Sequence, residues 1–344
     1  MGTPDSPKTS DVRRYLREFL MDGRVIDIPF LPRFLLVNGI IAPFRAPKSA
    51  KTYRELWTDE GSPLKVYGYQ LRDLVQQTLG DGYHVSLAMR YQQPSIEAGL
   101  RELKDKGFQR IIVVPLFPQY ASATTGSIKE KVMELISRWQ LIPELVFVDQ
   151  FYQHPGFIET FAQLGRKYLE AESYDHVIFS YHGLPERQIR KGDPTGTCLQ
   201  GNCCGTIHAG NSHCYRAQCF ETSRLLAAAL PLPDDQYTVC FQSRLGRDPW
   251  IKPYTEDLIK ELAHGGKKRV LAFSPAFVAD CLETTIEVGD EYKELFEEEG
   301  GEHWQLVESL NVHPDWVTTL VDLIRGGGRV QTAEAGNVAA AVKS

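Results

Sequence analysis

The stretch His176-Val177-Ile178-Phe179-Ser180-Tyr181-His182-Gly183 begins as a short apolar run and ends in a tight turn. Similar runs, rich in Val, Ile and Phe, alternate with amphipathic segments along the chain; they cover residues 85–89, 110–115, 145–148, 237–241 and 269–273. Continuous apolar runs of this length are typical of parallel strands that are buried on both faces. The pattern predicts an α/β protein with doubly wound parallel sheets and helices between the strands.

Several of these runs lead into loops crowded with polar, proline or aromatic residues: 90–94, 117–120, 181–183, 242–244 and 274–277. In open α/β sheets, the loops that follow the carboxyl ends of the strands build the ligand crevice. None of these loops carries the Gly-x-Gly-x-x-Gly element of a dinucleotide site. We therefore expect a cleft between two Rossmann-like domains, and no dinucleotide in it.

The length of 344 residues suits two α/β domains rather than one. The strand pattern breaks near residues 150–156, which predicts an N-terminal domain over residues 1–152 and a C-terminal domain over residues 153–311. A cysteine-rich insertion, residues 195–219, interrupts the second domain. Residues 312–326 should form a final amphipathic helix, and the glycine- and alanine-rich tail, residues 327–344, should be disordered.

The composition narrows the class of protein. With 42% hydrophobic and 24% charged residues, the chain has the balance of a soluble globular protein, and its net charge of −6 argues against a nucleic-acid partner. The first residues lack a secretory signal pattern, so we expect a cytoplasmic protein with reduced cysteines. The most apolar stretch, residues 28–44, contains three prolines and an arginine, which makes it too broken to span a bilayer. It could instead dip into a membrane surface as a peripheral contact at the inner membrane, or simply pack within the protein.

His182 is the first candidate for a chemical role. Gly183 and Pro185 force a sharp turn behind it, at the end of a predicted strand. A histidine held in this way could present a neutral imidazole to the cleft as a proton acceptor. The alternative is a histidine that only hydrogen-bonds the loop backbone.

An acidic row follows the run that ends at residue 273. Glu283, Glu287, Glu291 and Glu294 recur at helical spacing, so their carboxylates should line one helix face. Because the row begins beside the expected cleft, it could lead a divalent cation inward. The alternative is a solvated surface helix.

The cysteine-rich insertion points to a metal centre. It holds Cys198, Cys203, Cys204, Cys214 and Cys219 among several glycines. In a reducing compartment such a cluster indicates metal binding rather than disulfides. The neighbours Cys203 and Cys204 would normally face apart, so we expect only one of them to be a ligand, which gives four ligands from these five residues. Four thiolates suit a [2Fe-2S] cluster or a structural zinc, and His208 and His213 leave mixed ligation open.

Taken together, these segments resemble the ferrochelatase family, with order and spacing that agree from residue 2 to about residue 325. The histidine segment, Ile178–Pro185 with Lys191–Pro194, looks like the family's signature. The other matching segments are Tyr53-Arg54, Gly61–Pro63, Arg90-Tyr91, Pro118–Tyr120 with Thr124–Ser127, Gln242-Ser243 with Pro249-Trp250, Phe277–Thr284 and Glu308–Asn311.

The resemblance implies an enzyme, a lyase that inserts ferrous iron into protoporphyrin IX or a related porphyrin, with the macrocycle in a cleft between the domains. It implies that His182 accepts the pyrrole protons, that Glu283 relays protons or delivers iron, and that Glu287 and Glu291 line the approach. Residues that would hold the ring, its propionates or its distorted conformation are Tyr53, Arg54, Ser62, Arg90, Tyr91, Tyr120, Ser127 and Phe277.

The chain departs from the family pattern in three places. The chain starts at Gly2-Thr3-Pro4, the turn that follows the first strand in the family, so we expect either that the start is misassigned or that the N-terminal sheet is short of one strand. Cys281 stands where some relatives have histidine. Some members hold a [2Fe-2S] cluster with C-terminal cysteines, which this chain lacks, so we expect an internal variant of that cluster within Cys198–Cys219. Two other functions stay open: an iron-sulfur sensor on a chelatase scaffold, and a chelatase for another tetrapyrrole, such as a cobalt chelatase. The sequence does not decide the oligomeric state.

Overall fold

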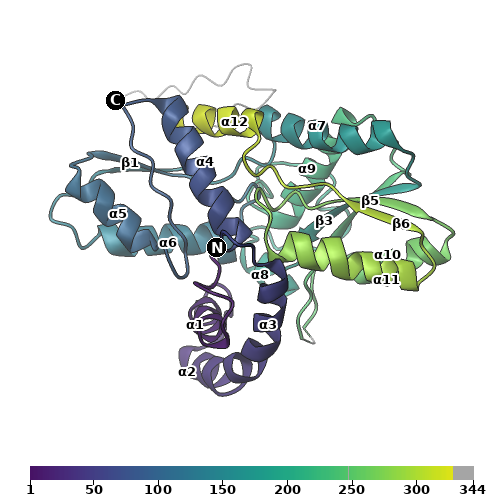
Figure 1. Ribbon diagram of the computed structural model, residues 1–344, viewed down its shortest axis with the longest axis horizontal. Coiled ribbons are helices and arrows are strands. Elements are labelled where there is room, and N and C mark those ends of the chain that lie inside the picture. Colours follow the sequence, from purple (N-terminus) through teal and green to yellow (C-terminus); the bar gives the residue numbers. More distant parts are fainter. Residues whose placement is uncertain (247, 328–344) are drawn as a thin grey trace.

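The computed structural model describes residues 1–246 and 248–327, and its strands form two parallel sheets (Figure 1). β1 (Arg110–Val113) pairs with β2 (Glu144–Phe147). A larger sheet has the order β4 (Tyr237–Gln242), β3 (His176–His182), β5 (Arg269–Phe273) and β6 (His303–Leu306). All of these pairings are parallel, which confirms the predicted α/β class with parallel sheets.

Helices connect the strands. The α-helices are α1 (Thr9–Leu20), α2 (Phe30–Leu35), α3 (Ala42–Leu56), α4 (Pro63–Leu79), α5 (Ile96–Asp105), α6 (Ser127–Ile136), α7 (Pro155–Ala171), α8 (Glu186–Lys191), α9 (Tyr215–Ala229), α10 (Thr255–His264), α11 (Tyr292–Glu298) and α12 (Pro314–Arg325). In the described part of the chain, the π-helical segments are η1 (Leu36–Ile41), η2 (Ser122–Gly126) and η3 (Glu283–Glu291). Wide turns of this kind are rare and often occur at functional sites.

The larger sheet is buried on both faces, which explains the continuous apolar run of β3. Val177, Phe179 and Tyr181 belong to an apolar cluster with side chains of α7, α9 and α12. Ile178 points to the other face, where it joins a second cluster with side chains of α10 and α11. In Figure 1 these two groups of helices lie on opposite sides of the sheet.

One predicted strand is wrong, and one strand was not predicted. Residues 85–89 do not form a strand, because a strand needs a neighbour along its length. Within the described ranges, the β-type pairings of this region are the single bridges Gly2–Tyr91 and Met89–Ser95. The strand β6 was not predicted, because its sequence His-Trp-Gln-Leu mixes polar and apolar residues, as an edge strand allows.

The limits of the two predicted domains remain a prediction. The β1–β2 sheet precedes residue 152, and the four-stranded sheet follows residue 153. Apart from residue 327, the tail that is predicted to be disordered lies outside the described residues.

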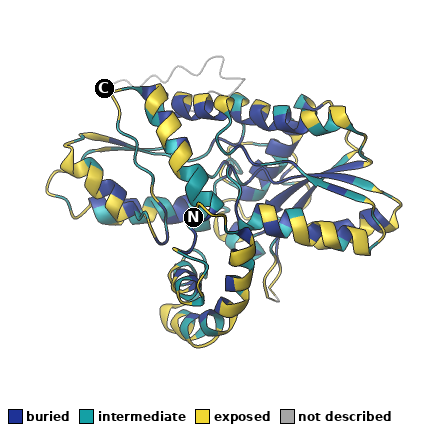
Figure 2. Cartoon of the chain, viewed as in Figure 1, coloured by how far each residue is buried: buried dark blue, intermediate teal, exposed yellow. Residues whose placement is uncertain are grey.

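The helices α1, α2 and α3, with η1, form a lobe that projects from the sheets (Figure 1). The alanines Ala42, Ala46 and Ala50 repeat every fourth residue on α3, are fully buried, and let α1 pack closely against it. The far end of the lobe is exposed (Figure 2), with Phe30 64% and Phe44 77% accessible. No helix within the described ranges has both the length and the apolar character needed to cross a membrane.

Candidate active site

His182 is the last residue of β3 and is half-buried. Its Nδ1 lies 2.7 Å from the carbonyl oxygen of Gly183. A carbonyl oxygen only accepts hydrogen bonds, so Nδ1 must carry the hydrogen, and a neutral ring then has a free lone pair on Nε2. A hydrogen bond to the loop backbone was the alternative role for His182. This bond, from Nδ1 to the Gly183 carbonyl oxygen, also leaves Nε2 free to accept a proton.

Gly183 makes this turn feasible. A Cβ atom at this position would lie 2.8 Å from the Gln242 carbonyl oxygen and 3.0 Å from the Trp250 ring. Both distances are shorter than normal contacts, so no other residue fits without displacing β4 or Trp250. The Trp250 ring packs near the His182 ring, with 6.4 Å between their centroids.

Glu287 is linked to His182 through β4. Gln242 pairs with His182 in the β3–β4 register, and its side-chain Nε2 donates to Glu287 Oε2 at 3.0 Å. Ser243 Oγ donates to the same oxygen at 2.6 Å. Burial raises the pKa of Glu287; the hydrogen bond from Ser243 and the charge of His182 oppose this rise, and the charge of Glu283 adds to it. The structure thus brings His182, Glu283 and Glu287 into one electrostatic group.

The acidic row leads from this group to solvent. Glu283 and Glu287 are half-buried, whereas Glu291 and Glu294 are exposed. Burial and nearby carboxylates raise the pKa of Glu291, although Lys48 opposes them. Asp280 precedes the row, and its carboxylate accepts from Ser309 N at 3.0 Å and from the amide of Asn311 at 2.7 Å.

The projecting lobe reaches the inner end of the row. The Glu283 carboxylate is close enough to raise the pKa values of Tyr15 and Tyr53, for which burial is the larger cause. The two tyrosine rings meet edge to face with 6.3 Å between their centroids. Cys281 is buried beside Glu283. Tyr53, an expected ring contact, therefore shares its surroundings with Glu283.

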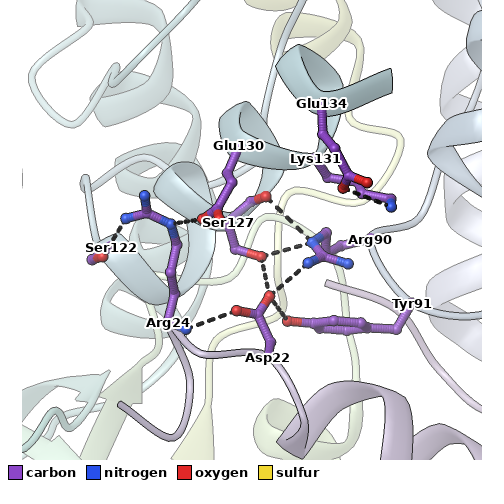
Figure 3. A network of polar contacts seen from close by, with 9 residues as sticks. All are labelled: Asp22, Arg24, Arg90, Tyr91, Ser122, Ser127, Glu130, Lys131 and Glu134. Atoms are coloured by element: carbon purple, nitrogen blue, oxygen red, sulfur yellow. Dashed lines mark hydrogen bonds and ion pairs between the residues drawn. The ribbon is translucent and has the colours of Figure 1, made fainter. Parts of the chain in front are cut away.

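The side chain of Asp22 accepts hydrogen bonds from Arg90, Tyr91 and Ser127 (Figure 3). Asp22 was not predicted from the sequence. Asp22 Oδ2 accepts from Arg90 Nη2 at 2.7 Å, from Tyr91 OH at 2.9 Å and from Ser127 Oγ. Burial acts to raise the pKa of Asp22, but the bonds from Ser127 and the Arg24 N–H and the charge of Arg90 hold it below its usual value. The three predicted ring contacts thus form one network with a buried carboxylate.

The remaining expected ring contacts differ in exposure. Arg54 is exposed on α3, whereas Ser62 is buried with its hydroxyl 3.1 Å from that of Thr3. Tyr120 and Phe277 are half-buried in the loops that follow β1 and β5. The structure therefore leaves Tyr120 and Phe277 partly accessible and encloses Ser62.

The cysteine-rich segment gathers four of its five cysteines. The sulfurs of Cys203 and Cys204 are 3.7 Å apart, so the expectation that neighbouring cysteines face apart is wrong here. A contact between the Cys204 and Cys214 thiols is the main cause that raises the pKa of Cys204 and lowers that of Cys214. Burial raises the pKa of Cys198 to about 11, and the nearby Cys203 and Cys204 add to the rise. The fifth, Cys219, is fully buried on α9 beside Tyr215.

All seven cysteines are free thiols. Nowhere in residues 1–246 and 248–327 do three or more His, Cys, Asp or Glu side chains stand in an arrangement that could hold a metal ion. The chemistry of Cys198, Cys203, Cys204 and Cys214, four soft donors in one loop, nevertheless suits a group held by thiolates.

A separate hollow of about 580 Å³ lies between α7 and α12. His154, Glu159, Asp315 and Asp322 are among its lining residues, and none of the predicted site residues lines it. It is therefore a different place from the group around His182.

Comparison with known proteins identifies the family to which the sequence is similar. The sequence model of the ferrochelatase family matches residues 1–327. A ferrochelatase from Legionella pneumophila (strain Lens) is 45% identical over 324 residues, which cover 94% of this chain and 96% of the relative. One from Coxiella burnetii (strain Dugway 5J108-111) is 45% identical over 326 residues, covering 94% and 91%.

Among solved structures, SirB from Bacillus subtilis with Fe3+ aligns with a TM-score of 0.51 at 15% identity, covering 78% of this chain and 92% of SirB. At this identity the likeness shows the fold alone, which agrees with the parallel sheets described above.

Proposed function

This chain belongs to the ferrochelatase family, enzymes that insert iron into a porphyrin for haem synthesis, and we propose that His182 and Glu283 carry the reaction on protoporphyrin IX. The observation that supports these roles most directly is the His182 ring itself, whose bond to Gly183 leaves Nε2 free to accept a proton. Glu283 and Glu287 lie in the same electrostatic group.

The chemistry requires a base and an exit for protons. Each pyrrole N–H of the porphyrin must lose its proton as ferrous iron enters the ring, and a positioned imidazole can take it up. Glu287, whose pKa is raised, can pass a proton toward Glu291 and solvent. The same row of carboxylates offers hard oxygen ligands to iron that enters from outside.

The porphyrin ring would lie against residues of both predicted domains, including the lobe that α1, α2, α3 and η1 form. Tyr53, Arg54, Tyr120 and Phe277 are the proposed direct contacts, while Ser62, Arg90, Tyr91 and Ser127 support them through buried hydrogen bonds. Contacts remote from the reacting nitrogens can supply the energy that distorts a flat macrocycle.

The test is metallation of protoporphyrin by ferrous or zinc ions, followed in the visible spectrum without oxygen. We expect wild-type protein to convert the porphyrin and His182→Ala to lose at least about 100-fold in kcat. His264→Ala removes an exposed imidazole bonded to Glu299 and serves as the control. Normal turnover by His182→Ala would refute the assignment, and failure of the wild type with iron but success with cobalt would favour a different chelatase.

The cysteine-rich segment is proposed to hold a [2Fe-2S] cluster through Cys198, Cys203, Cys204 and Cys214. Support comes from the gathering of these four thiols and the complete burial of Cys219 on α9. Such a cluster would supply thiolate-bound iron that fixes the loop and can change its oxidation state.

Visible absorption and electron paramagnetic resonance of protein purified without oxygen test this proposal. Cys204→Ser should abolish the cluster signals, whereas Cys219→Ser should keep them. Loss of the signals in Cys219→Ser, or zinc as the only metal found by elemental analysis, would contradict it. Cluster signals in a wild-type protein that metallates no porphyrin would instead support the sensor function.

A further inference from the structure

The cysteine-rich segment leads directly into the candidate active site. Cys214 precedes the first residue of α9, Tyr215, which is buried. The Tyr215 hydroxyl donates to the His182 carbonyl oxygen at 2.8 Å. The residue next to a cysteine thus holds the backbone of the proposed proton acceptor.

Gln218, one turn further along α9, makes a similar bond to Tyr120 in the predicted N-terminal domain. It is fully buried, and its Oε1 accepts from the backbone N–H of Tyr120 at 2.7 Å. Its Nε2 donates back to the Ser212 carbonyl oxygen at 2.6 Å, within the cysteine-rich segment. His213, also in that segment, meets the Tyr120 ring edge to face with 5.8 Å between the centroids.

These contacts lie on one face of α9. Tyr215, Gln218 and Thr222 follow each other at three- and four-residue spacing, and Thr222 Oγ1 accepts from Gln119 Nε2 at 3.0 Å. The face therefore bonds the C-terminal end of β3, through His182, and the loop after β1, through Gln119 and Tyr120. The thiols of Cys204 and Cys214 meet at the N-terminal end of the same helix.

We infer that Tyr215 and Gln218 are positioning residues that couple the state of the cysteine thiols to His182 and Tyr120. Binding of a metal group to these thiols, or its loss, shifts the first turn of α9 and with it both site residues. The inference rests on the proposed function, because it assumes that His182 and Tyr120 act on the porphyrin.

A double-mutant cycle tests this coupling. Porphyrin metallation (kcat and KM) and porphyrin affinity without metal ion, from the Soret shift, are measured for wild type, Tyr215→Phe, Cys204→Ser and the double variant. Tyr168→Phe is the matched control, because it removes a hydroxyl that bonds Glu308 outside the site, also at 2.8 Å.

We expect Tyr215→Phe to lower kcat by roughly 3- to 10-fold, the equivalent of one hydrogen bond, with porphyrin affinity within about two-fold of wild type. Gln218→Leu should instead weaken porphyrin affinity, since it releases Tyr120. If the coupling is real, the double variant loses no more than the worse single variant. If Cys204→Ser does not fold, wild-type protein with and without its metal takes its place in the cycle.

Two results would overturn the inference: effects of Tyr215→Phe and Cys204→Ser that multiply in the double variant, or a Tyr215→Phe enzyme that behaves like Tyr168→Phe. A wild-type protein that metallates no porphyrin would refute the proposed function instead, before the cycle begins.

Discussion

At the scale of single residues, the site depends on which atoms remain free after the protein has made its own hydrogen bonds. His182 uses Nδ1 on Gly183 and keeps Nε2, and Glu287 accepts from Gln242 and Ser243 while its pKa is raised. In the proposed mechanism, the first group accepts a proton and the second carries it.

Glu287→Gln tests the proton path. The amide keeps the size of the side chain and part of its hydrogen bonding but cannot carry a proton, so kcat should fall at least about 10-fold. Glu294→Gln, at the exposed end of the row, should leave kcat unchanged. Equal rates for both variants in stopped-flow metallation would remove Glu287 from the path.

Asp27 predicts a pH dependence of stability. Burial acts to raise its pKa, but bonds from Lys191 and Arg187 lower it to about 2. A carboxyl whose pKa is lower in the folded state stabilises the fold above its unfolded pKa of about 4, and this contribution is lost as the pH falls toward 2.

Asp27→Asn should therefore lower the free energy of unfolding by about 1 kcal/mol at pH 7, a value reduced because both cationic partners are partly exposed. Urea unfolding at pH 7 and pH 3 measures this, and the difference from wild type should shrink at the lower pH. A difference that grows toward acid would contradict the ion-pair account.

Only some of the candidate site residues could be predicted from the sequence. The sequence indicates His182 and the glutamate row, because a strand end and a helical spacing are local patterns. Asp22 carries no such pattern: its partners Arg90 and Ser127 lie 68 and 105 residues away in sequence, and only the folded chain brings them together. The close approach of the Cys203 and Cys204 thiols depends on loop geometry in the same way.

At the scale of elements, buried strands can be predicted from their apolar sequences, whereas edge strands cannot. β3 and β5 are apolar because helices cover both of their faces, whereas β6 at the sheet edge mixes polar residues. Residues 85–89 have the composition of a strand without a partner to pair with, which no local pattern can reveal. The spacing of the glutamates predicted a helix but not the π-helical form of η3.

The exposed end of the lobe predicts contact with a membrane surface. Phe30, Leu31 and Leu35 are each more than 60% accessible. Changing Phe30 and Leu35 to Asp should weaken sedimentation with phospholipid vesicles at least about 10-fold, because each apolar side chain contributes about 1.5 to 3 kcal/mol when buried. Leu141→Asp with Ile142→Asp, on an equally exposed loop before β2, is the control. Equal loss in both pairs would indicate nonspecific adsorption.

At the scale of the whole molecule, the candidate site residues His182, Tyr120 and Phe277 lie at the end of β3 and in the loops that follow β1 and β5, where open α/β folds bind ligands. The two-sheet architecture could be predicted because alternating strands and helices are a property of the sequence. The contacts of α9 could not, because they depend on one helix face that bonds the end of β3 in one sheet and the loop after β1, a strand of the other sheet.

The most direct test of the account is a crystal structure of this protein with a bound porphyrin. We predict the macrocycle beside His182, with a pyrrole nitrogen within about 3 to 3.5 Å of Nε2, directly or through one water, and the Glu283 carboxylate on the opposite side of the ring. A porphyrin bound in the hollow between α7 and α12, or protein side chains filling the space between His182 and Glu283 in the complex, would contradict it.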